Sequence, residues 1–130
     1  MSSPPLRHIL FVEDDADIQM VAAMALEAVG GFSVTTCASG GEAVSRFAEI
    51  APDLVLLDVM MPGMDGPATL AALRQLPEAA NVPVVFMTAR VQAYEMARYR
   101  ELGAVDVIAK PFDPMTLADT VKTIWRSLHD

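Results

Sequence analysis

The stretch Asp53-Leu54-Val55-Leu56-Leu57-Asp58 decides the fold class. Its four consecutive aliphatic side chains make the run apolar on both faces, which is typical of a strand buried in a parallel sheet between two layers of helices. Further short apolar runs occur along the chain, each followed by a stretch with helical spacing. These runs are His8–Glu13, Phe32–Cys37, Val82–Thr88 and Val105–Lys110.

Residues that begin and end helices punctuate the stretches between the runs. Helix starts are expected at Asp15, at Ser39 or Gly40, at Asp65 and at Asp113-Pro114, and helix ends at Gly30-Gly31, Pro52, Pro77 and Gly103. The first helix should turn an apolar stripe to the core, made of Ile18, Val21, Ala22, Ala25, Leu26 and Val29. The alternation predicts a doubly wound α/β fold of (βα)5 type, and it leaves the strand order open.

Composition limits the class of protein. The 130 residues suit one domain, and the net charge of −8 argues against direct nucleic-acid binding, because phosphate backbones are held mainly by Lys and Arg. The lone cysteine, Cys37, permits no internal disulfide and suits a reducing cytoplasm. No membrane span or signal peptide is visible. We expect a cytoplasmic domain at residues 7–130 after a short disordered tail at residues 1–6, without membrane contact.

Four of the five runs end in polar groups: Glu13-Asp14, Asp58, Thr88 and Lys110. Ligands of doubly wound sheets bind beyond the carboxyl ends of the strands, so these groups mark a candidate site. Taken alone, Asp58 fits a capping residue as well as a nucleophile. Three neighbouring carboxylates would repel one another, and a hard cation such as Mg²⁺ is therefore expected among them.

The same residues stand in four motifs: F-V-E-D-D (11–15), L-L-D-V-M-M-P-G-M-D-G (56–66), M-T-A (87–89) and K-P-F (110–112). Their order and spacing resemble those of bacterial response-regulator receiver domains, from about Arg7 to Leu128. The resemblance implies the flavodoxin-like strand order 2-1-3-4-5, which brings the ends of strands 1, 3, 4 and 5 together. It also implies a signalling phosphoacceptor of a two-component phosphorelay, which catalyses only its own phosphorylation and dephosphorylation and is not otherwise an enzyme.

The resemblance assigns Asp58 as the phosphoacceptor and places Mg²⁺, or Mn²⁺, beside it. Asp14 and Asp58 would coordinate the ion directly, Glu13 mainly through water, and Met60 through its main-chain carbonyl. Asp15 would cap the first helix instead.

The other motif residues would serve the phosphoryl group. Lys110 and Thr88 would contact its oxygens, and the small Ala89 would leave the site open to a donor. The peptide bond between Lys110 and Pro111 is usually cis in this family, an isomer that is costly except before proline.

The resemblance implies a sensor histidine kinase or a histidine-phosphotransfer protein as partner. We expect Met20, Ala23 and Met24 to face solvent on the first helix, where they either dock this partner or are ordinary scattered apolar residues. The protein should be a monomer or weak dimer. Because the last helix ends the chain, we expect either a receiver that acts alone or a piece cut from a longer protein, and we favour the first. Val107 stands where many receivers carry Tyr or Phe, which puts aromatic coupling to an output surface in doubt.

Three alternatives are weaker. A small Mg²⁺-dependent phosphohydrolase would carry a second acid two residues after the nucleophile, where this chain has Met60. A degenerate receiver would lack part of the acidic and basic set that is present here. An FMN carrier would need a hydroxyl- and glycine-rich loop after the first strand, and this loop is acidic.

Overall fold

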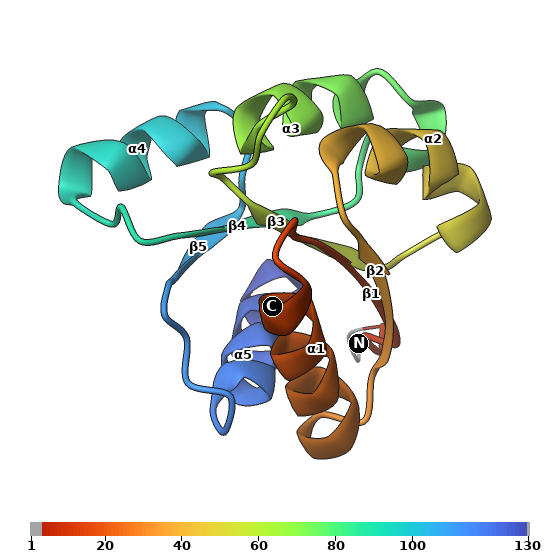
Figure 1. The fold of residues 1–130 in the computed structure, drawn as a ribbon, viewed down its shortest axis with the longest axis vertical. Coiled ribbons are helices and arrows are strands. Elements are labelled where there is room, and N and C mark those ends of the chain that lie inside the picture. The colour runs from red at the N-terminus through yellow and green to blue at the C-terminus, as the bar shows by residue number, and fades with distance from the viewer. Residues whose placement is uncertain (1–3, 130) are drawn as a thin grey trace.

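The computed structural model describes residues 4–129 as one five-stranded parallel sheet with helices on both faces (Figure 1). The strands are β1 (His8–Val12), β2 (Ser33–Cys37), β3 (Leu54–Asp58), β4 (Val84–Thr88) and β5 (Asp106–Ala109). The helices are α1 (Ala16–Met24), α2 (Gly40–Ile50), α3 (Gly66–Arg74), α4 (Ala93–Glu101) and α5 (Leu117–His129). A π-helical turn at Ala25–Val29 continues α1, and a 3₁₀ turn at Pro77–Ala79 follows α3.

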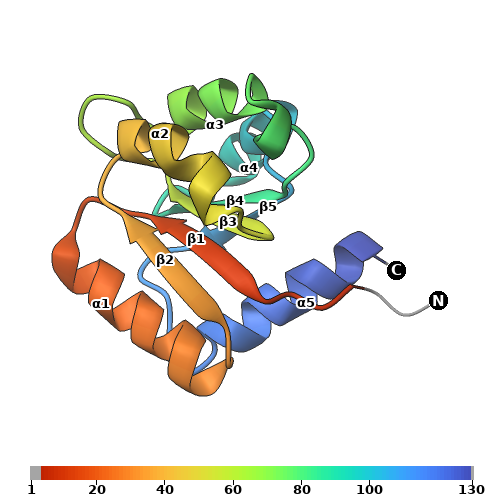
Figure 2. The ribbon, with the colours of Figure 1, turned by 90° about the vertical axis from the view of Figure 1, so that its right-hand side faces the viewer.

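The strand order is β2-β1-β3-β4-β5, which confirms the predicted doubly wound order 2-1-3-4-5. Helices α2, α3 and α4 cover one face of the sheet, and α1 and α5 cover the other (Figures 1 and 2). Strand β3 lies in the centre, and all five of its residues are buried. Helices cover both faces of this strand, which explains why its sequence is a continuous apolar run, as predicted.

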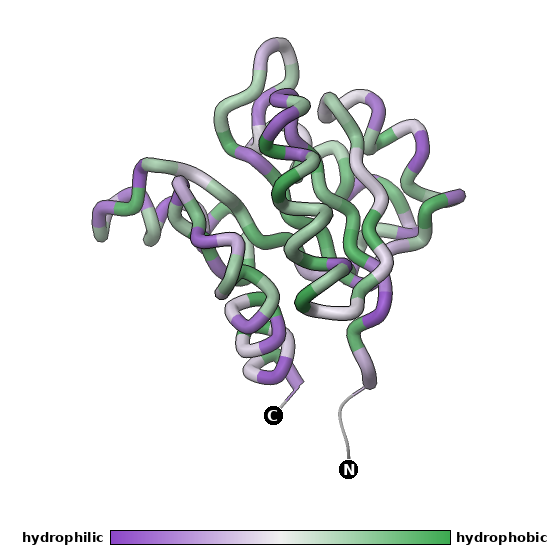
Figure 3. The backbone as a smooth tube through the Cα atoms, turned by 60° about the horizontal axis from the view of Figure 1, so that its bottom comes forward, coloured by the Kyte–Doolittle hydropathy of each residue, from purple (hydrophilic) through white to green (hydrophobic). Residues whose placement is uncertain are grey.

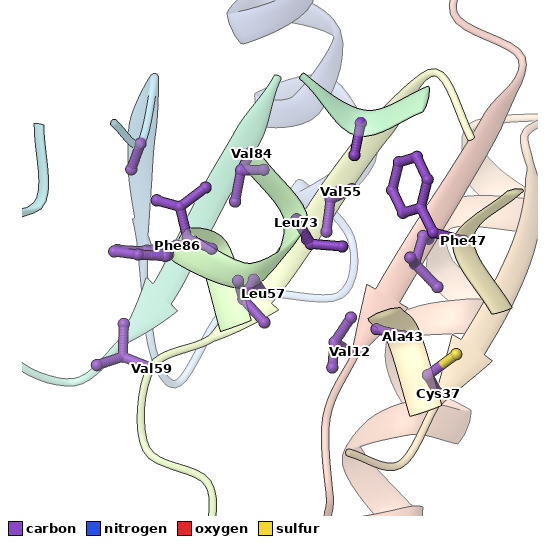
Figure 4. Close-up of a cluster of buried hydrophobic side chains, with 14 of the residues drawn as sticks. Val12, Cys37, Ala43, Phe47, Val55, Leu57, Val59, Leu73, Val84 and Phe86 are labelled. Atoms are coloured by element: carbon purple, nitrogen blue, oxygen red, sulfur yellow. The ribbon is translucent and has the colours of Figure 1, made fainter. Parts of the chain in front are cut away.

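Each face of the sheet has its own hydrophobic core. On the α2–α4 side, Phe47 and Leu73 from the helices pack over Val12, Leu57 and Phe86 of the strands (Figure 4). On the other side, Leu26 and Val121 pack over Ile9, Leu56 and Val85, which point the opposite way along the same three strands. The alternation of side chains along each strand divides one apolar sequence between two cores.

Three predicted helix caps are confirmed. Asp15 accepts hydrogen bonds from the N–H groups of Asp17 and Ile18, Ser39 from that of Glu42, and Asp65 from that of Ala68. Gly66, which follows the Asp65 cap, lies close to the backbone at the end of β3. A Cβ added to Gly66 would stand 2.8 Å from the Val59 Cα and 2.9 Å from the Asp58 carbonyl oxygen. The absence of a side chain at Gly66 thus lets α3 begin directly behind the end of β3.

Two predictions about helices were wrong in detail. Val21 and Val29 are exposed, so the core stripe of the first helix is narrower than predicted. The π-helical turn explains Val29, because its wider i→i+5 winding rotates the following residues away from the 3.6-residue period. Helix α5 begins at Leu117 and not at Pro114, because the residues after Asp113 first form a turn that the Asp113 carbonyl and carboxylate hold.

The two ends of the described chain lie at the same end of the molecule (Figures 2 and 3). The indole N–H of Trp125 donates a 2.8 Å hydrogen bond to the Pro4 carbonyl, and Leu6 packs against the α1–α5 core. Residues 1–3 of the expected tail lie outside the described residues. Among residues 4–129, no helix combines the length and the apolarity that a membrane span requires.

Candidate functional site

Three carboxylates meet at the carboxyl edge of the sheet. Glu13 and Asp14 directly follow β1, and Asp58 ends β3, whose residue Leu57 is the register partner of Val12. Each of the three offers an oxygen that lies within 4.8 Å of the others. Glu13 and Asp58 are only 1% and 3% exposed, whereas Asp14 is open to solvent. The pairing of β1 with β3 therefore brings together residues that are 44 positions apart, counted from Asp14 to Asp58.

Lys110 reaches this cluster from the end of β5. Its ammonium lies 2.8 Å from Glu13 Oε1 and 3.3 Å from Asp58 Oδ1, so one cation contacts both buried carboxylates. The Lys110 backbone is held in turn, because its N–H donates a 2.9 Å hydrogen bond to the Thr88 carbonyl. The following peptide bond to Pro111 is cis, as the family resemblance implied.

Burial controls the ionisation of the cluster. It raises the pKa of Glu13 to about 6, and the negative charge of Asp58 acts in the same direction against the lowering effect of Lys110. Burial alone would lower the pKa of Lys110, but the hydrogen bond to Glu13 and the charges of Asp58 and Glu13 outweigh it and raise the pKa above its ordinary value. The site therefore favours a charged lysine and disfavours a full set of charged carboxylates.

The remaining site residues surround Asp58 on neighbouring loops. Thr88 ends β4 and is buried, and its Oγ1 accepts a 3.1 Å hydrogen bond from the Arg90 N–H. Ala89, the next residue, is exposed. The Met60 N–H lies 3.4 Å from Asp58 Oδ1, which holds the β3–α3 loop against the carboxylate. The structure thus brings the predicted phosphoacceptor, metal and phosphate-contact residues to one edge of the sheet.

Sequence reasoning missed the role of two residues near the site. The Gln19 side chain donates a hydrogen bond to the Glu13 carbonyl and holds the β1–α1 loop to the first helix. No spacing rule in the sequence signals a bond across this loop. The other is Arg90, whose backbone N–H donates a hydrogen bond to Thr88 Oγ1. A backbone donor leaves no signal in the sequence, because every residue except proline carries one.

The predicted docking residues lie on the exposed side of α1. Met20 and Met24 are 61% and 62% exposed, as expected, whereas Ala23 is partly buried. Val107 is partly buried on β5, where it pairs with Phe86 and packs against the α2–α4 core.

The order of the parallel strands and the three carboxylates at their carboxyl ends define a flavodoxin-like domain with an acidic cluster at the sheet edge. The chain belongs to the response regulator receiver domain family, whose model matches residues 9–122. Receiver domains are signalling phosphoacceptors of two-component systems, and this chain has their fold and acidic pocket.

Individual relatives agree with this assignment. The chain is 37% identical over 119 residues to the transcriptional regulatory protein CseB of Streptomyces coelicolor, covering 92% of this chain and 49% of that protein. It is 39% identical over 121 residues to the phosphate regulon transcriptional regulatory protein PhoB of Rhizobium meliloti, covering 93% and 53%. The chain thus spans about half the length of these relatives. The crystallised chemotaxis protein CheY4 of Vibrio cholerae superposes with a TM-score of 0.84 at 27% identity, covering 92% of this chain and 99% of that one.

The raised pKa of Glu13 predicts how the metal-free domain responds to pH. Because this pKa, about 6, lies above the ordinary 4.5, the folded state holds the proton more tightly than the unfolded chain does. The resulting stabilisation is complete below pH 4.5 and is lost as the pH rises through 6. Relative to Glu13→Gln, wild type should lose about 2 kcal/mol of unfolding free energy between pH 4.5 and 7.

Urea unfolding in the presence of EDTA across this pH range measures the difference between the two proteins. Other titrating groups are common to both, and Lys110 stays charged throughout because its pKa is raised. A difference that instead grows in favour of wild type as the pH rises would mean that the ion pair with Lys110, and not burial, dominates the pKa of Glu13.

Proposed function

We propose that this domain accepts a phosphoryl group on Asp58 from a phosphohistidine donor, with the help of a divalent cation, and that the modification changes which partners it binds. The convergence of two further carboxylates and one lysine on the buried Asp58 carries the proposal. Asp58 ends a strand that is hydrogen-bonded on both sides, so its backbone is held while its carboxylate stands at the open edge. A carboxylate in such a position can act as a nucleophile and form an acyl phosphate.

The charge balance favours a cation at the cluster. Three carboxylates share one ammonium, and each close carboxylate pair repels by roughly 3 kcal/mol at an effective dielectric constant of 20. The donor set consists only of oxygens, which suits Mg²⁺ or Mn²⁺. Asp14, Asp58 and the Met60 carbonyl would hold the ion directly and Glu13 through water. When bound, the ion supplies positive charge for phosphate oxygens.

The residues of this chain have distinct parts in the transfer. A carboxylate oxygen of Asp58 attacks the phosphorus in line, the new P–O bond forms as the P–N bond breaks, and the donor histidine departs as imidazole that takes up a proton. Lys110, already 3.3 Å from Asp58, neutralises charge on the phosphoryl oxygens. Thr88 accepts its hydrogen bond from Arg90, so its hydroxyl proton remains available for a phosphoryl oxygen. Ala89 and Pro111 border the path without filling it, since both are exposed. Water later hydrolyses the acyl phosphate and resets the domain.

The donor is a sensor histidine kinase or a histidine-phosphotransfer protein that docks on α1. Met20, Val21 and Met24 form an exposed apolar strip on this helix. The strip adjoins a cavity of about 230 Å³ that Val21, Phe112 and the stem of Lys110 line with almost wholly apolar surface. An apolar helix edge beside the phosphoacceptor suits a helical donor. Signalling by such contacts requires no direct nucleic-acid binding, in keeping with the net charge of −8.

Phosphorylation should occur once, at Asp58, and should require a divalent cation. Incubation with acetyl phosphate and Mg²⁺ should add one phosphoryl group to wild type and none to Asp58→Asn, as measured by intact mass. Addition of EDTA should abolish the uptake. Equal uptake by both proteins would place the acceptor at another residue.

Millimolar Mg²⁺ should raise the melting temperature of the unphosphorylated domain, because the ion binds the folded cluster and not the unfolded chain. Asp14→Ala should blunt this response, whereas Asp17→Ala, which removes an exposed carboxylate from the first turn of α1 outside the cluster, should preserve it. Thermal unfolding with and without Mg²⁺ checks both variants. An undiminished response in Asp14→Ala would move the metal away from this carboxylate.

Replacing Met20 and Met24 together by Lys should slow phosphoryl transfer from a phosphorylated histidine-phosphotransfer protein, because the charges disrupt the apolar strip. Labelling by acetyl phosphate should be spared, since this small donor needs no docking surface. Rapid-quench transfer rates with the two donors test the claim. Equal slowing with both donors would point to damage at Asp58, and unchanged transfer from the protein donor would remove α1 from the interface.

A further inference from the structure

The loop between β1 and α1 consists of residues 13–15 alone, and two of them carry carboxylates of the acidic cluster. Figure 2 shows the chain turning back from the end of β1 directly into α1. Asp15 caps α1, whereas Glu13 and Asp14 belong to the cluster. This short loop must therefore place two carboxylates beside Asp58 while it reverses the direction of the chain.

The Asp14 carboxylate has no support of its own. It is exposed, and among residues 4–129 no N–H or O–H group donates to it. Glu13, by contrast, is buried and lies 2.8 Å from the ammonium of Lys110. The direction in which the Asp14 side chain leaves the loop therefore depends on the backbone that carries it. That backbone begins with the peptide bond between Glu13 and Asp14.

The Gln19 side chain holds this peptide bond. Its amide nitrogen donates a hydrogen bond to the Glu13 carbonyl, and among residues 4–129 no other group donates to that oxygen. The opposite end of Glu13 is anchored to the sheet, because its N–H donates a 3.0 Å hydrogen bond to the Cys37 carbonyl. A peptide unit is planar, so a bond at its oxygen orients the whole plane and, with it, the Cα of Asp14.

Gln19 is itself fixed in the first part of α1. Its backbone N–H donates a 3.0 Å hydrogen bond to the carbonyl of the cap residue Asp15, and its side chain is partly buried. Only the NH₂ group of the Gln19 side chain can donate to a carbonyl, so an apolar side chain of the same length cannot replace it. The helix, its cap and the loop are thus joined by bonds that meet at Gln19.

We propose that Gln19 is a positioning residue for the metal site, which holds the Asp14 carboxylate toward the cluster through the peptide bond between Glu13 and Asp14. The inference rests on the metal site of the proposed function. Groups that orient metal ligands without touching the metal contribute about tenfold to a hundredfold to metal affinity.

The bond acts on the metal-free loop. Without it the peptide plane turns more freely, and only a fraction of the molecules hold Asp14 in the binding orientation. The apparent Kd for the metal rises by the reciprocal of that fraction. At saturating metal every molecule holds the binding orientation, so the loaded site is the same with and without Gln19.

Metal binding to Gln19→Met tests the proposal. Methionine keeps the length of the side chain and its helix propensity but has no donor. The Kd for Mn²⁺, measured on the intact domain from the EPR signal of the free ion, should rise about tenfold. The control Gln75→Met makes the same exchange at an exposed position at the end of α3 and should bind Mn²⁺ as wild type does. Far-UV circular dichroism shows that each variant is folded during the titration.

Phosphorylation by acetyl phosphate separates positioning from damage to the fold. In Gln19→Met the Mg²⁺ concentration that gives half of the maximal labelling rate should rise about tenfold, and the rate at saturating Mg²⁺ should stay within about twofold of wild type. A lower rate at saturating Mg²⁺ with an unchanged half-saturating concentration would assign Gln19 to the fold or to the transfer step, and not to the metal.

Further outcomes judge the proposal and its premise separately. An unchanged Kd for Mn²⁺ in Gln19→Met, or an equal weakening in Gln75→Met, would overturn the role of Gln19. Mn²⁺ binding that Asp14→Ala leaves intact would refute the proposed metal site and this inference with it. Mn²⁺ binding that depends on Asp14 and Gln19 in a protein that takes up no phosphate would support the inference and refute phosphorylation at Asp58.

Discussion

The parallel pairing of β3 with β1 on one side and with β4 on the other determines where every group of the site lies. All three strands end at the same edge, so Glu13 and Asp14, Asp58 and Thr88 follow one another across the sheet, and β5 adds Lys110 from the next position. A slip of one residue in any pair would turn the buried side chains of that strand to the opposite core. The two hydrophobic cores that hold the register in place therefore also hold the catalytic geometry.

The cluster at this edge is electrostatically incomplete. Burial withdraws water from Glu13 and Asp58, and the single ammonium of Lys110 is shared between them. The upward shift of the Glu13 pKa expresses the same imbalance as a preference for a proton. A divalent cation would stabilise a site in this condition, and a phosphoryl group on Asp58 would offer a further partner to that cation and to Lys110. This charge imbalance lies at the sheet edge, and the strands β3 and β4 behind it are wholly buried.

The loops that carry the site also carry the surfaces around it. The β3–α3 loop contacts Asp58 through Met60 and is anchored behind it by the close approach of Gly66. The β4–α4 loop contacts Thr88 through Arg90 and leads into α4. Backbone N–H groups thus join both loops to Asp58 and Thr88. Val107 takes no part in these two contacts and packs against the core from β5.

The sequence by itself determined the features that depend on neighbouring residues. The five strands, the caps at Asp15, Ser39 and Asp65, and the set of polar residues at the strand ends all follow from periodicity and from short-range hydrogen bonds. Family motifs added the strand order, which the apolar pattern had left open. Only the tertiary structure decided the rest: the contact of Lys110 with Glu13 across 97 positions and the narrowed face of the first helix. The distances between these segments depend on how the crossover helices pack against the sheet and on the π-helical turn after α1. No local sequence pattern encodes the packing of the crossovers or the π-helical turn.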